Sequence, residues 1–531
     1  MNHHALSTLA GLLSLTAAAH AQCELEQLTA PLEAVPRDFG RALALDGDLL
    51  AVGDPLAGPG SPLSGAVFLF RFDETGQANL EATLTPPPGS SGDRFGAALS
   101  VDGNRVAIGA RFDDDAGGNA GAVHVFVRTD GVWGLEQILS GPYLELGRAV
   151  ALDGDTLVAT AIGTGAVFER NAGGWSLSAN LEPPVGTPVA DDWGVALALS
   201  DGAVAVGSPS AESCLGCADS SGSVALYDLD YSGPTLVQVL SGPTVGARFG
   251  TAVALDGDRL AVGAPQGDGS VAGTGSAHTY LRQAGTWTVE ATLHAALGQG
   301  GDGFGSAVAV DVPWLVVGAP GAGAGGKLDT GAAHPIELGS GGWFERSTLL
   351  ADERESFEAA GTAVAVDDAR AAFSAPDVFG PDPYGGEVFE RPLDNGALLY
   401  ACPANLSIAL EERQEIVLRG GAASANQLYF VFGSATGIAP ALPIAPGVQL
   451  PLVPDAYLEL TAREPNSQVH VSTFGFLDAD GNATAFLALP KNLDPSTAGL
   501  VLAHAAVILD SGAQFGAVEL ATNAGAVVLQ P

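Results

Sequence analysis

The amino-acid sequence predicts an all-β fold, a seven-bladed β-propeller followed by a small β-sandwich-like C-terminal domain. Three observations predict it: a unit that occurs seven times, an abundance of turn-forming residues, and a C-terminal segment without the repeat. Of the 531 residues, 72 are glycine and 33 are proline, and 47% are hydrophobic. Glycine and proline break helices and separate short strands, so this composition favours many strands joined by tight turns.

The repeat is defined by two positions at a fixed separation. The first residue of a Phe-Gly pair stands at positions 39, 95, 146, 193, 249, 304 and 360, where Leu146, Trp193 and Ala360 replace the phenylalanine. A glycine stands 14 residues after each of these, at 53, 109, 160, 207, 263, 318 and 374, with Thr160 and Ser374 as substitutes. A constant internal distance with variable spacing between units indicates rigid units joined by loops of different length.

Each unit has the pattern of four strands, as in a propeller blade. The first strand, such as 252–255, alternates small and large apolar residues, which indicates burial on both faces. An Asp-Gly pair such as Asp256-Gly257 favours a tight hairpin to the second strand. The seventh unit lacks an obvious fourth strand, whereas residues 24–28 have the pattern of one. We therefore expect the N-terminal strand to complete the last blade and close the ring.

The N-terminal segment indicates that the protein is exported. An apolar run from Leu6 to Ala18 precedes Ala19-His20-Ala21, which has the small-x-small pattern of a signal peptidase site. We expect a signal peptide at 1–21, a propeller at 22–402 and a C-terminal domain at 403–531. No later apolar run approaches the roughly 20 residues of a membrane helix, so membrane insertion is not expected. The predicted location is extracellular or at the cell surface.

The four cysteines are expected to form disulfide bonds, as is common in exported proteins. Cys23 and Cys402 flank the two chain ends that ring closure brings together, so we expect them to pair. Cys214 and Cys217 stand in one loop of the fourth unit. A redox C-x-x-C motif normally opens a helix, and a zinc site needs two further ligands, so a disulfide within the loop is the better interpretation.

The charge of the chain excludes two classes of partner. Sixty acidic residues against 21 basic ones give a net charge of −39. Such a surface repels nucleic acids and anionic lipids. Solubility is the simplest role for the charge, and binding of cations is the alternative.

No catalytic constellation stands out. His124, His278 and His334 each follow a glycine and two small residues, and Phe68, Phe168 and Phe389 have the same sequence context in other units. They are therefore interpreted as one repeated packing position rather than as a shared site. The G-x-G-x-x-G pattern at 321–326 precedes a strand, whereas a dinucleotide site needs a helix there. A pair of carboxylates of the glycosidase type is the remaining catalytic possibility.

The run from Phe249 to Pro265, which joins the two repeated elements, resembles the FG-GAP repeat of integrin α-chain head domains and many secreted bacterial proteins. The resemblance covers residues 39 to about 390 and implies a β-propeller. Family units often carry a calcium loop between their first and second strands. Here that loop is reduced to the bare turn at Asp256-Gly257-Asp258, which is too short to surround the ion with six to eight oxygens. We expect no family calcium site and no cofactor.

Two functions are compatible with these observations. The first is a secreted binding or adhesion propeller that recognises an extracellular protein or glycan without catalysis. The alternative is a secreted polysaccharide hydrolase or lyase that uses Asp or Glu residues of the propeller face.

The ligand is expected on the face that carries the connections from second to third strand and from each unit to the next. The second-to-third connection of the third unit is short and comprises Ala161, Ile162, Gly163 and Thr164, whereas its neighbours are longer. This difference predicts a notch at the third blade. Asp113, Asp114 and Asp115 stand in the longer connection of the second unit, where they are candidates to attract a cationic group or to hold a metal ion.

Overall fold

The structure is a computed structural model of the chain. It describes residues 26–30, 38–58, 63–73, 77–88, 91–185, 192–211, 220–230, 233–267, 273–295, 299–322, 330–339, 341–345, 349, 359–367, 370–376, 387–393, 399–402, 405–407, 413–419, 428–434, 442–445, 448–450, 462–463, 470–471, 474–476, 482–488, 501–509, 518–521 and 525–530. Glu26–Leu393 form one compact unit, and residues from Asp394 onward belong to another. The predicted signal peptide at 1–21 lies outside the described residues.

The first unit consists of seven four-stranded antiparallel sheets. The first three blades contain β2 (Ala42–Asp46), β3 (Leu49–Asp54), β4 (Ala66–Phe72), β5 (Ala78–Leu84), β6 (Ala98–Asp102), β7 (Arg105–Ala110), β8 (Ala122–Thr129), β9 (Val132–Leu139), β10 (Val150–Asp153), β11 (Thr156–Ala161), β12 (Thr164–Asn171) and β13 (Gly174–Leu181). The next three contain β14 (Ala196–Ser200), β15 (Ala203–Ser208), β16 (Ser223–Asp230), β17 (Gly233–Ser241), β18 (Ala252–Asp256), β19 (Arg259–Ala264), β20 (Ser276–Gln283), β21 (Thr286–Leu293), β22 (Ala307–Asp311), β23 (Trp314–Ala319), β24 (Ala332–Gly339) and β25 (Gly342–Glu345). The seventh contains β26 (Val364–Asp367), β27 (Arg370–Ala375), β28 (Glu387–Pro392) and β1 (Glu26–Thr29).

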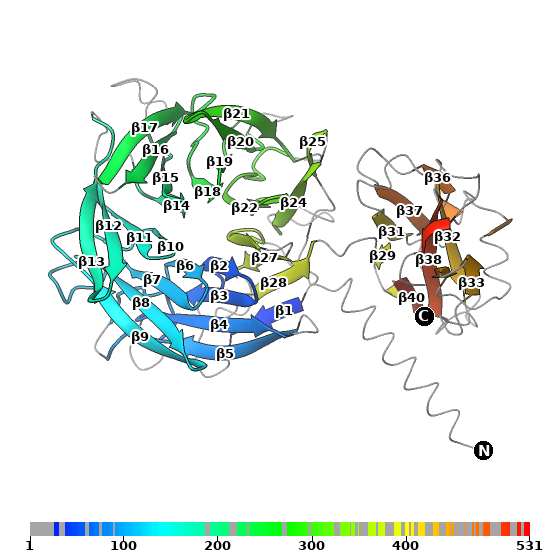
Figure 1. The fold of residues 1–531 in the computed structure, drawn as a ribbon, viewed down its shortest axis with the longest axis horizontal. Helices are drawn as coiled ribbons and strands as arrows, with labels where there is room; N and C mark the ends of the chain where they lie inside the picture. Colours follow the sequence, from blue (N-terminus) through cyan, green and yellow to red (C-terminus); the bar gives the residue numbers. More distant parts are fainter. Residues whose placement is uncertain are drawn as a thin grey trace, which may run out of the picture. The chain divides into compact units, whose positions relative to one another are not determined.

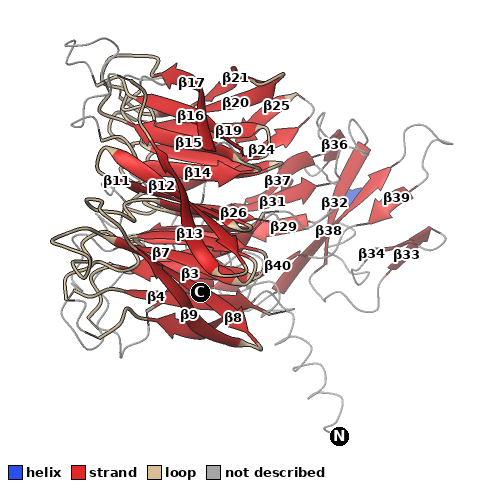
Figure 2. Ribbon diagram, turned by 60° about the vertical axis from the view of Figure 1, so that its left-hand side comes forward, coloured by secondary structure: helices blue, strands red, loops and turns tan. Residues whose placement is uncertain are grey.

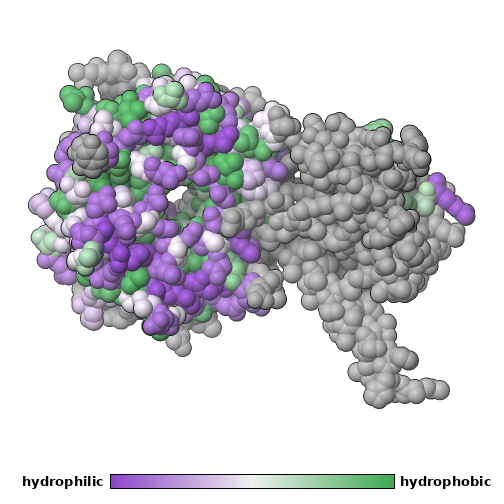
Figure 3. Space-filling model, viewed as in Figure 1, coloured by the Kyte–Doolittle hydropathy of each residue, from purple (hydrophilic) through white to green (hydrophobic). Residues whose placement is uncertain are grey.

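The blades form a closed ring, as predicted. The first strands of consecutive blades contact one another around the centre, and β26 contacts β2 (Figure 1). The seventh blade takes its outermost strand from the N-terminal segment, because β1 pairs with β28 through Leu28 and Val388. Figure 1 shows β1 in blue beside β28 in yellow. Hydrophilic residues surround the opening at the centre of the propeller in Figure 3.

The repeated glycines are the points at which neighbouring blades touch. A Cβ atom at Gly263 of the fifth blade would overlap the carbonyl oxygen of Gly305, the Phe-Gly glycine of the sixth blade. Gly53, Gly109, Gly207 and Gly318 meet the corresponding carbonyl of the next blade in the same way. Within each blade, the Phe-Gly glycine also donates its N–H to the carbonyl of the residue 13 positions later, at the partner-glycine position, as Gly250 does to the Gly263 carbonyl at 3.0 Å. Close packing of two backbones therefore explains why the motif requires glycine.

The third blade replaces this contact with a hydrogen bond. Thr160 stands at the glycine position, and its hydroxyl donates to the Gly194 carbonyl at 2.6 Å. The same hydroxyl accepts the N–H of Ala149 at 3.1 Å, so the buried oxygen is satisfied within the fold. The threonine is therefore accommodated without loss of the contact between blades.

The first residue of each Phe-Gly motif corresponds to one position of the third strand in the same blade. The pairs, in blade order, are Phe39 with Phe68, Phe95 with His124, Leu146 with Ala166, Trp193 with Ala225, Phe249 with His278, Phe304 with His334, and Ala360 with Phe389, as the strand registers align them. In the fourth blade Trp193 corresponds to Ala225, and in the seventh blade Ala360 corresponds to Phe389. In the four blades whose motif residue is Phe39, Phe95, Phe249 or Phe304, the rings of the pair are in contact, with centres 5.2 to 5.5 Å apart.

One assignment from the sequence was wrong at this position. Phe168 was expected to be the counterpart of the three histidines, but Ala161 pairs with Thr164, which places Ala166 there. Phe168 instead corresponds to Phe126 of the second blade, which pairs with Val106 as Phe168 pairs with Leu157. The reason is that the shortened hairpin of the third blade brings Gly165 into the strand itself.

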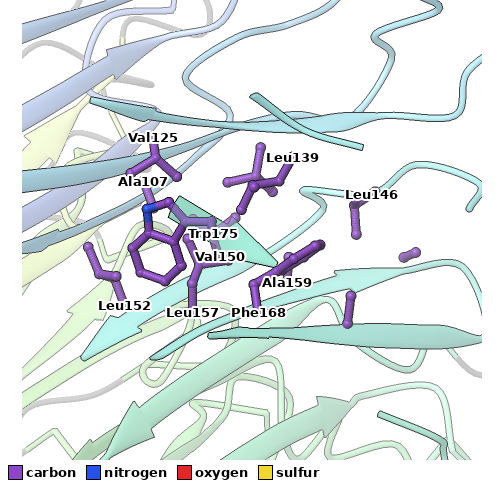
Figure 4. Close-up of a cluster of buried hydrophobic side chains, with 13 residues drawn as sticks. Ala107, Val125, Leu139, Leu146, Val150, Leu152, Leu157, Ala159, Phe168 and Trp175 are labelled. Atoms are coloured by element: carbon purple, nitrogen blue, oxygen red, sulfur yellow. The ribbon is translucent and has the colours of Figure 1, made fainter. Parts of the chain in front are cut away.

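The core lies between adjacent blades. One cluster combines Val123 and Val125 of the second blade with Leu157, Phe168 and Trp175 of the third, all of them buried. Figure 4 shows this cluster around the indole of Trp175. Because every blade buries both faces against its neighbours, the apolar residues of the inner strands do not alternate with polar ones.

The carboxylates of the Asp-Gly turns link neighbouring blades. Asp102 accepts a hydrogen bond from the backbone N–H of Gly154 at 2.6 Å, and Asp256 accepts one from Val312 at 2.8 Å. The same bond joins Asp46 to Gly103, Asp153 to Asp201 and, across the ring closure, Asp367 to Gly47, while the Ser200 hydroxyl accepts from Gly257. These aspartates, which the sequence analysis explained by the hairpin alone, therefore also link neighbouring blades at five junctions of the described ring.

Replacing Asp256 with alanine is expected to destabilise the propeller by about 1.5 kcal/mol, the lower end of the range for hydrogen bonds to charged groups, because this bond is partly exposed to water. Asp258→Ala is the matched control, since its carboxylate lies exposed in the same turn. Thermal unfolding of both variants measures the difference. Equal melting temperatures for the two would show that the turn aspartates do not connect the blades.

The second unit contains two larger sheets. One has the order β29-β31-β37-β35; the other has the order β30-β40-β38-β32-β36, with β39 beside β38, and β33 pairs with β34. The strands are β29 (Leu399–Cys402), β30 (Asn405–Ser407), β31 (Arg413–Arg419), β32 (Leu428–Ser434), β33 (Leu442–Ala445), β34 (Val448–Leu450), β35 (His470–Val471), β36 (Phe474–Phe476), β37 (Asn482–Ala488), β38 (Val501–Leu509), β39 (Val518–Ala521) and β40 (Gly525–Gln530). Because β29 pairs with β31, the boundary falls at Leu393 rather than at 402. The predicted sandwich packing stays a prediction.

Candidate functional site

The two faces of the propeller differ in their connections. One carries the Asp-Gly turns; we call the other the loop face, and it carries the connections from second to third strand and from each blade to the next. In Figure 2 the longer loops gather at the left of the propeller, where β17 ends. In the first, second, fourth, fifth and sixth blades, a backbone hydrogen bond closes the base of the second-to-third connection, such as that from the Gly121 N–H to the Asp113 carbonyl at 2.9 Å. These bonds fix the bases of the connections on the loop face.

The connection of the third blade is as short as the sequence predicted. Ala161 and Thr164 are the last pair of β11 and β12, and only Ile162 and Gly163 form the turn between them. Gly163 has a φ of +72°, which suits glycine in a two-residue hairpin. Ile162 donates its N–H to the Leu144 carbonyl at 2.9 Å, in the segment that connects the second and third blades. The neighbouring connection after β7 runs from Ala110 to Ala122.

The three consecutive aspartates of that neighbouring connection do not point in one direction. Asp113 is buried, with 4% of its surface exposed, whereas Asp114 and Asp115 are exposed. Its Oδ1 accepts the N–H of Asp115 at 3.1 Å, and its Oδ2 lies 3.5 Å from Nε2 of His124. Burial acts to raise the pKa of Asp113, but these two contacts outweigh it and hold the pKa below its usual range.

The expectation of a joint acidic site at these residues therefore needs correction. The Asp113 carboxylate organises its own loop, which leaves two exposed carboxylates. Within the described residues, no three His, Cys, Asp or Glu side chains gather as a metal-binding group.

A group of arginines occupies the loop face of the first three blades instead. Arg41 and Arg148 follow the Phe-Gly glycines of the first and third blades, Arg94 precedes Phe95, and Arg111 follows β7. Phe112 lies between two of them, with the guanidinium carbons of Arg111 and Arg94 at 4.6 and 5.7 Å from the centre of its ring. These residues, which we call the arginine cluster, were missed by the sequence analysis. An alignment of the seven Phe-Gly positions could have indicated the cluster, because an arginine flanks the motif in each of the first three units.

The three histidines of the third strands serve packing, as predicted. His124, His278 and His334 each present an edge to the phenylalanine of their own blade, with ring centres 5.2 to 5.5 Å apart. They belong to separate blades, and their polar neighbours differ. His334 Nδ1 lies 2.6 Å from the Glu345 carboxylate, whereas His278 lies between the hydroxyls of Ser276 and Thr292 at 3.0 and 3.2 Å.

His278 should make the stability of the propeller depend on pH. Burial, assisted by the charge of His294, lowers the pKa of His278 from 6.5 to about 4. The folded state therefore binds this proton less readily than the unfolded chain. The contribution to stability is complete above pH 6.5 and is lost as the pH falls from 6.5 to about 4, by about 1.4 kcal/mol for each unit between the two pKa values. The test is His278→Phe, which introduces the residue found at this position in the first blade, Phe68. We expect the free energy of unfolding of this variant to depend less on pH between about 4 and 6.5. The same pH dependence as in the unmodified chain would show that His278 is not the group responsible.

Three of the four cysteines of the predicted disulfides lie outside the described residues. Cys23, Cys214 and Cys217 lie outside them, and Cys402 is the last residue of β29. Both disulfides therefore stay predictions, and peptide mapping without reduction tests them. In the part of the chain that the structure describes, no helix has the length and apolar character to cross a membrane.

Comparison with protein families agrees with this geometry. The model of the FG-GAP repeat matches residues 79–126, 241–280 and 287–336. Each matched segment contains a Phe-Gly pair and its partner glycine, at Phe95 and Gly109, Phe249 and Gly263, and Phe304 and Gly318. The chain is an FG-GAP β-propeller protein. The other four blades of this FG-GAP propeller are defined by the same strand order and the same contacts between blades. No curated protein matches the chain.

Proposed function

We propose that this FG-GAP propeller is a secreted binding or adhesion protein that recognises an extracellular protein or glycan through its loop face, without catalysing a reaction. The observation that carries the proposal is the difference between the two faces. On the turn face, the aspartates are engaged in holding one blade to the next. On the loop face, connections of unequal length carry exposed charged side chains such as Asp114 and Asp115, beside the arginine cluster. Such variable loops on a rigid scaffold are the usual position of binding residues.

The predicted export signal and the FG-GAP repeats support this proposal, because both are compatible with an extracellular binding protein. The histidines are engaged in packing, and the acidic triplet is divided between a buried and two exposed carboxylates. Neither group offers a pair of carboxylates on either side of a substrate bond, as a glycosidase requires.

The experiment uses the full mature chain and compares insertions on the two faces of one blade. A flexible insertion of glycine and serine at Gly163 would cover the loop face, whereas the same insertion between Ala172 and Gly173, in the turn between β12 and β13, would lie on the opposite face. Binding is measured on arrays of glycans and extracellular proteins. We expect the insertion at Gly163 to abolish binding and the control insertion to preserve it.

Two results would overturn the proposal. Equal binding by both insertion variants would exclude the loop face. Turnover of a bound glycan that disappears with one Asp or Glu substitution would show catalysis.

A further inference from the structure

The arginines of the propeller fall into two groups with different environments. Those on the second and third strands of the blades form ion pairs, such as Arg71 with Glu81 at 2.6 Å and Arg170 with Glu136 at 2.9 Å. The same holds for Arg105 with Glu136, Arg128 with Glu81, Arg259 with Glu290, Arg282 with Asp228, and Arg370 with Glu390. In a chain with 60 acidic residues and 21 basic ones, such pairing is the expected state of an arginine.

The arginine cluster departs from this state. Among the described residues, neither Arg41 nor Arg94 has an ion pair. The nearest carboxylate of Arg111 belongs to Glu145, at the limit of 4.0 Å, and the buried Nε of Arg111 has no hydrogen-bond partner in the described part of the chain. Only Arg148 has a close partner, Asp192 at 3.2 Å. In the described part of the chain, two of the four guanidinium groups thus have no carboxylate within ion-pair distance.

The backbone holds this cluster in place. The N–H of Phe112 donates to the Asp93 carbonyl at 3.2 Å, which ties the loop after β7 to the residue before Arg94. The N–H of Arg148 donates to the Thr160 carbonyl at 3.2 Å, next to the short hairpin of the third blade. The guanidinium groups therefore extend from fixed backbone positions in three consecutive blades, so no backbone ordering is needed when a ligand binds.

The charges of the cluster act on one another. Burial lowers the pKa of Arg111 despite the Glu145 carboxylate, and the positive charges of Arg94, Arg148 and Arg41 lower it further. Burial raises the pKa of Asp38, whereas the charges of Arg41 and Arg94 act to lower it, so this carboxyl lies close enough to interact with the cluster. The fold therefore brings four arginines together within a molecule whose net charge is −39.

We propose that Arg41, Arg94, Arg111 and Arg148, together with Phe112, form a binding site for a single carboxylate or sulfate group carried by a glycan. This inference rests on the proposed function and names the chemistry of its ligand. Guanidinium groups form paired hydrogen bonds with planar oxyanions, and the half-exposed ring of Phe112 offers an apolar surface beside them. An acidic sugar presents both features, because its charged substituent adjoins the C–H groups of the ring.

The surroundings of the cluster limit the charge of the ligand. Asp114 and Asp115 are exposed in the same loop as Arg111, and Glu145 lies beside it. Together with the overall negative charge, these carboxylates repel a densely charged polymer. The site is therefore suited to an isolated acidic residue within a largely neutral oligosaccharide.

The test measures affinity by calorimetry with the full mature chain. The probes are a neutral oligosaccharide with one uronic acid, the same oligosaccharide with one sulfate ester, its uncharged form, and a short peptide with one glutamate. The variants are Arg94→Gln and Arg111→Gln. Arg248→Gln is the matched control, because Arg248 precedes Phe249 in the fifth blade as Arg94 precedes Phe95, and both residues have a φ near +55°.

We expect each cluster variant to bind the acidic oligosaccharide at least about tenfold more weakly, as loss of a charge-assisted hydrogen bond implies, while Arg248→Gln binds as the unmodified protein does. Preference for the uronic acid or for the sulfate ester identifies the source of the anion. Tighter binding of the peptide than of either acidic oligosaccharide would overturn the glycan assignment, and equal affinity of all three variants would overturn the site. If the Gly163 insertion abolishes binding of a ligand that both cluster variants retain, this inference fails and the proposed function stands.

Discussion

Replacing Gly263 with alanine is expected to lower the free energy of unfolding of the propeller by about 4 kcal/mol, among the largest effects of a single substitution. The added Cβ would overlap the carbonyl oxygen of Gly305, and the Gly305 carbon atoms lie directly behind it. A flexible side chain could turn away from such a contact, but here the obstacle is backbone at the start of the sixth blade. Relief requires the two blades to separate, which also weakens the packing of Ala261 against Phe304.

A matched control for this substitution is Gly134→Ala in β9. Gly134 is exposed and has no heavy atom within 4 Å of an added Cβ. This variant is expected to stay within about 0.5 kcal/mol of the unmodified chain, as surface substitutions do. Chemical unfolding followed by circular dichroism compares the two alanines directly. Similar unfolding midpoints would mean that the repeated glycine does not govern the contact between blades.

The same contact explains why the fold could be predicted from the sequence. Phe-Gly and its partner glycine recur because each copy satisfies the same steric requirement, the approach of one blade's backbone to the next. Five of the seven copies keep the partner glycine and make this contact, at Gly53, Gly109, Gly207, Gly263 and Gly318. The exception at Thr160 was visible as a substitution, but the hydrogen bond to Gly194 that makes it tolerable depends on the position of a carbonyl in another blade.

The position of Phe168 could not be obtained in this way. Matching glycines in the sequence aligned Gly165 with Gly121, although Gly165 pairs with Thr160 inside the sheet and Gly121 lies before its strand. A hairpin shortened to Ile162 and Gly163 shifts the alignment, and only the pairing of the backbone shows by how much.

The candidate site was predicted only in part, for a related reason. Loop lengths are a property of the sequence, so the short connection of the third blade was found. The direction of a side chain cannot be obtained from the sequence in the same way. Asp113 turns inward to His124, whereas Asp114 and Asp115 are exposed. The arginine cluster is assembled from three blades, so its members are separated by up to two repeats in the sequence and meet only through the ring.

Removing β1 is expected to have the largest effect of all, because the propeller has no covalent closure within the described residues other than the chain itself. Leu28 of β1 is buried and packs in the cluster that includes Phe39 and Phe68 of the first blade and Val388 of the seventh. Loss of that side chain alone should cost about 2–5 kcal/mol. Loss of the strand also frees the backbone groups of β28, which now pair with β1 from Glu387 to Glu390.

A chain of residues 31–531 should therefore unfold at a much lower temperature than a chain of residues 22–531, and it should self-associate through the exposed edge of β28. The closing experiment adds a synthetic peptide of residues 22–30 to the shortened chain. Because the peptide would supply the missing strand, it should restore the melting temperature in proportion to its occupancy, whereas a peptide with Leu28→Asp should not. A shortened chain that stays monomeric and retains its melting temperature without the peptide would show that three strands suffice for the seventh blade, and that the ring does not depend on its N-terminal strand.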